Sequence, residues 1–260
     1  MPDRIDSRAA GLRHVEHVMG MAVSIHVRDA LPPAILTAAI ESLHAVDAVF
    51  STYRAESEIS RLATGRLSLA ECRPAVRAVL GLADALRLRT RGYFDSLLPG
   101  PEGELRLDPS GVVKGWAVDG AAALLHRAGA RNFCVNAGGD VVTRSDGSAR
   151  GWRVGIRHPH DPRTIVAVVE GADLCVATSG AYERGAHVVD PHTRRPPAGI
   201  LSITVVGPDL ATTDAFATAA FAMGAAGPAW VASQPGYGVF AVRDDLQASC
   251  DDEFLRYRVA

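Results

Sequence analysis

The sequence predicts an α+β fold in which helices pack on a largely antiparallel sheet. Apolar residues recur at helical spacing over residues 34–50, 74–91 and about 113–128. Apolar stretches typical of strands occur at residues 21–27, 132–142, 151–159, 164–180 and 202–208. Helices and strands mix without a regular βαβ period, which favours an antiparallel over a parallel sheet.

The N-terminal half is expected to hold one strand and three long helices. Residues 1–14 are predicted to be a flexible leader, and residues 15–260 a single domain. The strand at residues 21–27 is followed by Pro32 and Pro33, which suit the first turn of a helix that extends to about residue 50. Residues 51–62 are polar and are expected to form a turn and a short helix. A second helix begins at Pro74, and a third is expected to begin near Val113.

Between the second and third helices, residues 92–115 are rich in Gly, Pro and acidic residues and are predicted to be irregular. The stretch NFCVNAGGDVV predicts a strand, a glycine-rich turn and a second strand. Further strands are expected at 151–159, 164–180 and 202–208, followed by the helix TTDAFATAAFAMG. A last hairpin-like pair is predicted from GYGVFAVRDD and EFLRYRVA.

Composition and charge narrow the classes of function. The formal net charge is −2, so the basic excess typical of nucleic-acid-binding proteins is missing. The four cysteines form no CxxC pair, and Cys134 and Cys175 lie in apolar stretches that predict buried free thiols. No apolar stretch reaches membrane-spanning length, and the N-terminus lacks the apolar segment of a signal peptide. We therefore expect a cytoplasmic protein without membrane insertion.

The helix TTDAFATAAFAMG carries Asp214 and Thr218 four residues apart, on one face of an otherwise apolar helix. Both offer oxygen atoms, the ligands that Mg²⁺ prefers. Helix capping is the alternative: Thr212 or Thr213 caps the helix, and the helix dipole favours the negative charge of Asp214 in the first turn. Capping does not account for Thr218, although a threonine hydroxyl also bonds back to the i−4 carbonyl.

Three other stretches are richer in polar and glycine residues than packing requires. In LDPSGVVKGWAVDG, Lys114 near a helix start favours an anion, and Asp119 offers a hydrogen-bond acceptor for a ligand. Their alternatives are a solvated lysine and an exposed helix residue. In VNAGGDV, the two glycines permit either close approach of a ligand or a plain hairpin turn, with Asp140 as a turn residue.

The third stretch, ATSGAYERGAHVVDPHT, offers the hydroxyls of Thr178 and Ser179, free N–H groups around Gly180, and His187 as a candidate general base. A hydrogen-bonded core histidine is the alternative for His187. A Ser179–His187–Asp190 triad is disfavoured because the GxSxG nucleophile motif is missing.

In this order, seven stretches resemble the ApbE family of FAD:protein FMN transferases. They are MGMAVSIHV, DAVFSTYRAESEISRL, GYFD, LDPSGVVKGWAVD, VNAGGDV, VATSGAYERGAHVVDPHT and TDAFATAAFAMG. The resemblance covers most of the chain from residue 19 to about residue 224 and implies an ApbE-like, T-fold-like architecture. It also implies Mg²⁺-dependent cleavage of FAD, with FMN attached to a Thr or Ser hydroxyl of an acceptor flavoprotein and AMP released.

The resemblance also implies roles for individual residues. Asp214, Thr218 and the backbone carbonyl of Ala122 match metal ligands, and His187 matches a residue that assists catalysis. Residues that match flavin-nucleotide contacts, or border the same pocket, are Met19, Tyr53, Tyr93, Phe94, Asp95, Lys114, Asp119, Thr178, Ser179, Gly180 and Val188.

The sequence departs from the family pattern in three places. The segment between Asp95 and Asp108 is shorter than usual, Ser96 stands where Pro is common, and LDPSG replaces a more usual double glycine. Two alternatives to the transferase stay open on sequence grounds. One is a Mg²⁺-dependent pyrophosphatase that hydrolyses FAD to FMN and AMP. The other is a non-catalytic module that binds and delivers FAD, for which a base such as His187 has no purpose.

Overall fold

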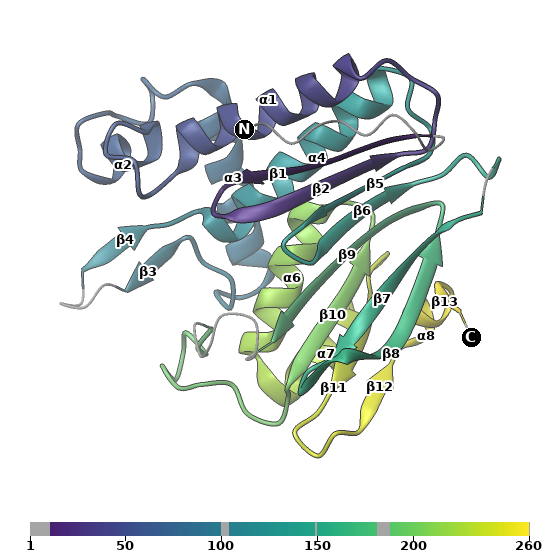
Figure 1. Ribbon diagram of the computed structural model, residues 1–260. Helices are drawn as coiled ribbons and strands as arrows, with labels where there is room; N and C mark the ends of the chain where they lie inside the picture. Colours follow the sequence, from purple (N-terminus) through teal and green to yellow (C-terminus); the bar gives the residue numbers. More distant parts are fainter. Residues whose placement is uncertain (1–10, 100–103, 149, 181–187, 260) are drawn as a thin grey trace.

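An eight-stranded antiparallel sheet forms the centre of the molecule (Figure 1). The computed structural model describes residues 11–99, 104–148, 150–180 and 188–259. The strand order is β1-β2-β5-β6-β9-β10-β11-β12, and each neighbouring pair is antiparallel. The bounds are β1 (Leu12–Val18), β2 (Met21–Val27), β5 (Phe133–Ala137), β6 (Asp140–Arg144), β9 (Asp173–Gly180), β10 (Ser202–Gly207), β11 (Gly238–Val242) and β12 (Ala248–Cys250).

Helices cover one face of this sheet, and a smaller sheet covers part of the other (Figure 1). The helical layer contains α1 (Ala34–Phe50), α4 (Ser110–Arg127) and α6 (Leu210–Ala222), with α3 (Pro74–Arg89) against α4. The smaller sheet has the order β13-β8-β7 and contains β7 (Trp152–His158), β8 (Asp161–Gly171) and β13 (Arg258–Val259). The predicted α+β class with a largely antiparallel sheet is confirmed.

The remaining elements are short and peripheral. They are α2 (Glu58–Ala63), the hairpin of β3 (Leu97–Pro99) and β4 (Leu105–Leu107), the 3₁₀ turn η1 (Gly224–Ala226), α7 (Gly227–Ala232) and α8 (Asp252–Leu255). Within the described part of the chain, no helix is both long and apolar enough to cross a membrane.

The central strands are apolar on both faces because both faces are covered. In β9, Cys175 and Ala177 belong to the core under the helices, whereas Leu174 and Val176 belong to a second core under β7 and β8. All residues of β10 are buried for the same reason. Because both faces are covered, these strands have continuous apolar runs. A sheet that is covered on one face only has apolar and polar residues in strict alternation.

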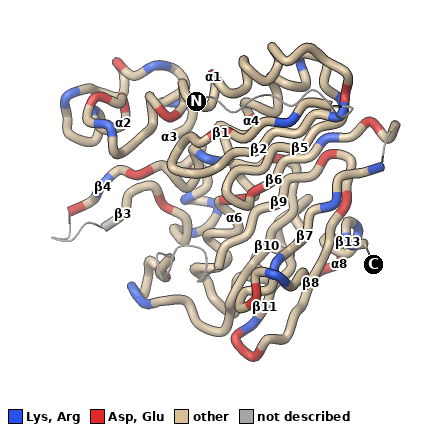
Figure 2. The backbone as a smooth tube through the Cα atoms, viewed as in Figure 1, with Lys and Arg blue, Asp and Glu red and all other residues tan. Residues whose placement is uncertain are grey.

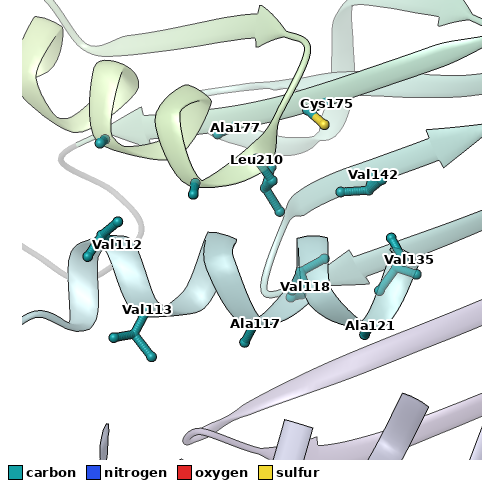
Figure 3. Packing of buried hydrophobic residues seen from close by; sticks show 14 of the residues in the cluster. Val112, Val113, Ala117, Val118, Ala121, Val135, Val142, Cys175, Ala177 and Leu210 are labelled. Atoms are coloured by element: carbon teal, nitrogen blue, oxygen red, sulfur yellow. The ribbon is translucent and has the colours of Figure 1, made fainter. Parts of the chain in front are cut away.

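Helix α4 lies in the middle of the helical layer and is buried on two sides. Figure 3 shows Val112 and Val118 pointing toward α6 and the sheet, and Val113 and Ala117 pointing the opposite way. The contact with α6 is very close at Gly115, where an added Cβ would lie 2.6 Å from the Cα of Ala211. A side chain at this position is therefore excluded by the backbone of α6, and the neighbouring residue Lys114 is brought against α6.

Helix α6 is not capped by the threonines that the capping alternative names. Asp209, not Thr212 or Thr213, is the N-cap residue, and its carboxylate accepts a hydrogen bond from the N–H of Thr212 at 2.8 Å. Asp214 therefore lies beyond the first turn and is 5% exposed. Its position has no capping role, because the orphan N–H groups of this helix are met by Asp209 and by Asp119 of α4.

Several other predicted boundaries change. Strand β1 begins at Leu12, inside the predicted leader, whose first ten residues lie outside the described part. Helix α4 begins at Ser110, before the predicted start at Val113, and the segment ahead of it holds the β3–β4 hairpin. The predicted C-terminal hairpin is wrong: β11 pairs with β12, whereas the last strand, β13, pairs with β8.

Candidate functional site

A cavity of about 1360 Å³ lies at the strand ends on one side of the main sheet. The β1–β2 turn, the β5–β6 turn and the C-terminal end of β9 lie together there, because neighbouring strands are antiparallel. The lining continues from α4 and α6 on the helical side to β7 on the other side. The cavity is larger than the common range of about 300–1000 Å³ for small-molecule sites, so its volume suits a large ligand.

One end of the cavity carries a compact group of charges. The ammonium group of Lys114 contacts Oδ2 of Asp140 and lies 3.3 Å from Oδ2 of Asp214. The two carboxylate side chains are only 4% and 6% exposed. Lys114 and Asp214 line the cavity, whereas Asp140 lies behind its wall and accepts a hydrogen bond from the N–H of Thr178 at 3.3 Å.

The group carries net negative charge at neutral pH. Burial by itself would lower the pKa of Lys114, but the charges of Asp214 and Asp140 outweigh it and raise the pKa above its usual value. Lys114 is therefore an ammonium ion, and its single positive charge neutralises only one of the two carboxylate charges of Asp140 and Asp214. The remaining negative charge favours a cation at this end of the cavity.

Hydroxyl groups complete this end of the cavity. Ser179 Oγ and Thr218 Oγ1 lie 3.4 Å apart, and both residues line the cavity beside Asp214. The hydroxyl of Thr178 is turned to the other side of β9, where it lies 2.8 Å from Oγ1 of Thr204. Asp214, Thr218 and Ser179 thus offer a carboxylate and two hydroxyls, an all-oxygen donor set that fits Mg²⁺.

This donor set contains few of the side chains that bind transition metals. Among the described residues, no three His, Cys, Asp or Glu side chains gather into a metal-binding group. Cys134 lines the cavity, but burial raises the pKa of its thiol to about 11, so it is protonated at neutral pH. The site therefore favours a hard cation and offers no thiolate ligand or nucleophile.

Aromatic side chains also line the cavity. Tyr53 is 98% exposed, and its ring is available for stacking on a flat ligand. Tyr93 packs edge-on against His192 with ring centroids 4.6 Å apart. Phe94 borders the cavity but is 4% exposed and belongs mainly to the core. Asp95 lines the cavity and accepts a hydrogen bond from the N–H of Leu97 at 2.9 Å.

The β1–β2 turn brings Met19 into the cavity wall with an unusual backbone. Met19 has φ 55°, followed by Gly20 with φ 72°, as in a two-residue hairpin turn of type I′. A positive φ costs a residue with a side chain roughly 1–2 kcal/mol. The turn holds Met19 at the cavity in spite of this cost.

The structure brings together most of the predicted site residues, with exceptions. Met19, Tyr53, Tyr93, Phe94, Asp95, Lys114, Thr178, Ser179, Gly180, Val188, Asp214 and Thr218 line the one cavity. Asp119 and Ala122 do not; they line a separate cavity of about 200 Å³ on the far part of α4. His187 lies outside the described residues.

Asp119 has a structural partner that sequence reasoning did not identify. Its carboxylate accepts hydrogen bonds from the N–H groups of Leu210 and Ala211, at 3.0 and 2.9 Å, and so caps α6 from a neighbouring helix. Burial raises the pKa of Asp119 to about 6, although the two N–H donors act in the opposite direction.

The cavity also contains residues that the sequence did not single out. Asn136 lines it next to the β5–β6 turn and accepts a hydrogen bond from the N–H of Gly139 at 3.0 Å. Strand β7 contributes a wall that includes Arg153, Arg157 and His158. No motif marks these residues, since their place depends on how the small sheet packs on the large one. Asp140 had a sequence signal, the preceding Gly-Gly pair, but it also fitted a turn.

Fold and cavity together define a ligand-binding α+β protein whose large cavity has an oxygen-rich, negatively charged end. Comparison with known proteins assigns the family. The model of the ApbE family matches residues 19–99 and 96–241, so the chain belongs to the ApbE family.

Curated relatives carry the name FAD:protein FMN transferase. The one from Rhodobacter capsulatus is 37% identical over 150 residues, which is 54% of this chain and 29% of the relative. The one from Vibrio cholerae is 36% identical over 134 residues, which is 46% of this chain and 40% of the relative. The aligned part of the chain thus spans less than half the length of these relatives.

Solved structures share the fold. The crystal structure of the ApbE protein from Thermotoga maritima has a TM-score of 0.83 to this chain. The match covers 96% of this chain and all of the other, at 21% sequence identity. At this identity the likeness supports the ApbE architecture and leaves the chemistry to be argued from the site.

Proposed function

We propose that this chain is a Mg²⁺-dependent FAD:protein FMN transferase that attaches FMN to a Thr or Ser hydroxyl of an acceptor flavoprotein and releases AMP. Membership of the ApbE family and the names of the relatives support the activity. The observation that carries it is a large cavity that contains an all-oxygen donor set, Asp214, Thr218 and Ser179, beside the ammonium of Lys114.

The cavity gives each part of FAD a suitable environment. The exposed ring of Tyr53 and the ring of Tyr93 suit a flat ring system. The pyrophosphate belongs at the charged end, where the Lys114 ammonium offsets its negative charge. Asp214 and Thr218 would hold Mg²⁺, which would add charge neutralisation and align the phosphate groups.

The proposed reaction breaks the phosphoanhydride bond of the FAD pyrophosphate and forms a phosphoester bond to the acceptor. The acceptor hydroxyl oxygen bonds to the FMN-side phosphorus, and the bond from that phosphorus to the bridging oxygen breaks. The bridging oxygen leaves with AMP, and the hydroxyl proton passes to a base. His187 is the base that we propose from the family resemblance; it lies outside the described residues.

The proposal is tested by incubating the protein with FAD, Mg²⁺ and a candidate acceptor flavoprotein. We expect a fluorescent band at the acceptor after denaturing electrophoresis, together with an equal amount of AMP. Release of AMP without the band, across several acceptors, indicates hydrolysis of FAD instead. Binding of FAD with neither product contradicts both activities and favours a binding module.

A further inference from the structure

Asp140 is buried, charged and close to the site, yet it does not touch the cavity. Its side chain is 4% exposed and lies behind the wall that Lys114 and Asp214 form. It follows Gly138 and Gly139, whose φ values of 62° and 107° make the turn at the start of β6. A ligand in the cavity is therefore affected by Asp140 only through another residue.

The residue through which Asp140 acts is Lys114. Oδ2 of Asp140 contacts the Lys114 ammonium, and Oδ1 is fixed by the N–H of Thr178 on the neighbouring strand. This second bond ties the carboxylate to the sheet, so its place does not depend on the lysine. The ammonium is held between a carboxylate on the sheet and the carboxylate of Asp214 on α6.

Lys114 and a divalent cation would compete for Asp214. The ammonium lies 3.3 Å from Oδ2 of Asp214, within the range of a direct ion pair. Two positive charges that share one buried carboxylate repel each other, because the protein interior screens charge poorly. A second carboxylate, that of Asp140, binds the ammonium and so reduces this repulsion.

We propose that Asp140 is a positioning residue that holds the Lys114 ammonium and so leaves the Asp214 carboxylate available to a divalent cation. The proposal rests on the assignment of Asp214 to Mg²⁺ in the proposed function. It gives Asp140 and Lys114 opposite effects on metal affinity, although the two side chains form one ion pair.

The test measures Mg²⁺ binding by isothermal titration calorimetry without FAD, in the wild type and in Asp140→Asn, Lys114→Met and the double variant. We expect Asp140→Asn to weaken Mg²⁺ binding by about 10- to 100-fold, the usual effect of losing an outer-shell partner. Lys114→Met is expected to bind at least as tightly as the wild type. The double variant is expected to return to within about 3-fold of the wild type, because the net charge near Asp214 is restored.

A purely structural role for Asp140 predicts a different pattern. Loss of packing or of the β6 turn would weaken binding equally in Asp140→Asn and in the double variant, and this result would overturn the proposal. Equal Mg²⁺ affinity in the wild type and Asp140→Asn would overturn it as well. If Asp140→Asn does not fold, the double variant decides, because both partners of the buried pair are then neutral. A loss of more than about 3-fold in that variant contradicts the proposal.

The same measurements separate this proposal from the proposed function. Failure of the wild type to bind Mg²⁺, or unchanged binding in Asp214→Asn, removes the metal assignment and the role of Asp140 with it. Binding that depends on Asp214 but not on Asp140 removes only the role of Asp140.

Discussion

Asp119 illustrates how a charged side chain is used for structure close to a functional site. Its carboxylate receives the first two N–H groups of α6, which the helix itself leaves unpaired. The same burial that protects these bonds raises the pKa of Asp119 to about 6. Asp119 is thus ionised at pH 7 at a cost to the folded state.

This cost predicts a pH dependence of stability. Between about pH 4 and pH 6, the folded state keeps the Asp119 proton that the unfolded state releases, so rising pH favours unfolding. We expect the free energy of unfolding of the wild type to fall, relative to Asp119→Asn, by about 1–3 kcal/mol over this window and to level off above it. Urea denaturation at a series of pH values measures it. A difference curve that is flat or rises with pH contradicts the raised pKa.

Asp214 has no such structural use as a cap, and its substitution tests the metal assignment directly. We expect Asp214→Asn to lose measurable Mg²⁺ binding and at least about 100-fold of AMP formation from FAD, since a metal ligand exceeds an outer-shell residue in effect. Asp84→Asn, at an exposed position of α3, is the matched control. Full activity in Asp214→Asn would show that the metal lies elsewhere.

Substitution of Tyr53 tests FAD binding without a change in stability, because the side chain is 98% exposed. Tyr53→Ala is expected to change the free energy of unfolding by less than about 0.5 kcal/mol. The affinity for FAD is expected to fall about 3- to 10-fold, the value of one aromatic stacking contact. Titration of FAD fluorescence measures the affinity, with Leu88→Ala, 70% exposed on α3, as the control. Unchanged affinity would place the flavin away from Tyr53.

At the scale of elements, the crossing of α4 and α6 determines the geometry of the charged end. Gly115 permits backbone contact between the two helices, and Lys114 and Asp214 are brought within 3.3 Å as a result. Asp119, one turn further along α4, then caps α6. One close crossing thus positions a charge pair and a helix cap together.

This crossing predicts opposite effects for two glycines of the same helix. Gly115→Ala places a Cβ 2.6 Å from the backbone of Ala211, and we expect a loss of about 1–3 kcal/mol in unfolding free energy. Outside its own helix, Gly120 has no atom of the described residues within 4 Å of an added Cβ, so Gly120→Ala is expected to gain about 0.5–1 kcal/mol from helix propensity. Thermal and urea denaturation compare the two. Equal effects at both positions would mean that α4 and α6 do not pack this closely.

At the scale of the molecule, the cavity joins parts that are far apart in the sequence. Its wall includes residues of the β1–β2 turn, α4, β7 and α6. In the view of Figure 2, basic and acidic residues are interspersed along the chain and do not gather in one region of a single sign. The distinctive charge lies instead at one end of the cavity, where Lys114 and Asp214 line the wall and Asp140 lies behind it.

A ligand that fills this cavity should therefore protect separate segments together. In hydrogen–deuterium exchange with FAD and Mg²⁺, we expect slower exchange in β7, in residues 51–53 and at the start of α4, since all three line the cavity. Helix α7 (Gly227–Ala232) has no residue in the lining and is expected to be unchanged. Protection confined to the helical side would exclude β7 from the binding site.

The long helices and most strands could be predicted from local pattern alone. Helices α1 and α3 and strand β2 match their predicted positions closely because apolar periodicity and proline starts are properties of the local sequence. The N-cap of α6 and the partner of the last strand were missed. Asp209, Thr212 and Thr213 are all suitable N-cap residues, so the local sequence does not distinguish between them. Strand β13 pairs with a strand about 90 residues earlier in the chain, and local pattern does not show such a pairing.

The sequence by itself determined the α+β class and brought out most of the cavity residues, because their motifs are local and follow one another in a recognisable order. The tertiary structure decided which polar residues share a site. It separated Asp119 and Ala122 from the cavity and placed Asp140 behind Lys114. Helix crossings and strand pairing bring residues together across the chain, and the spacing of residues along the sequence does not encode those contacts.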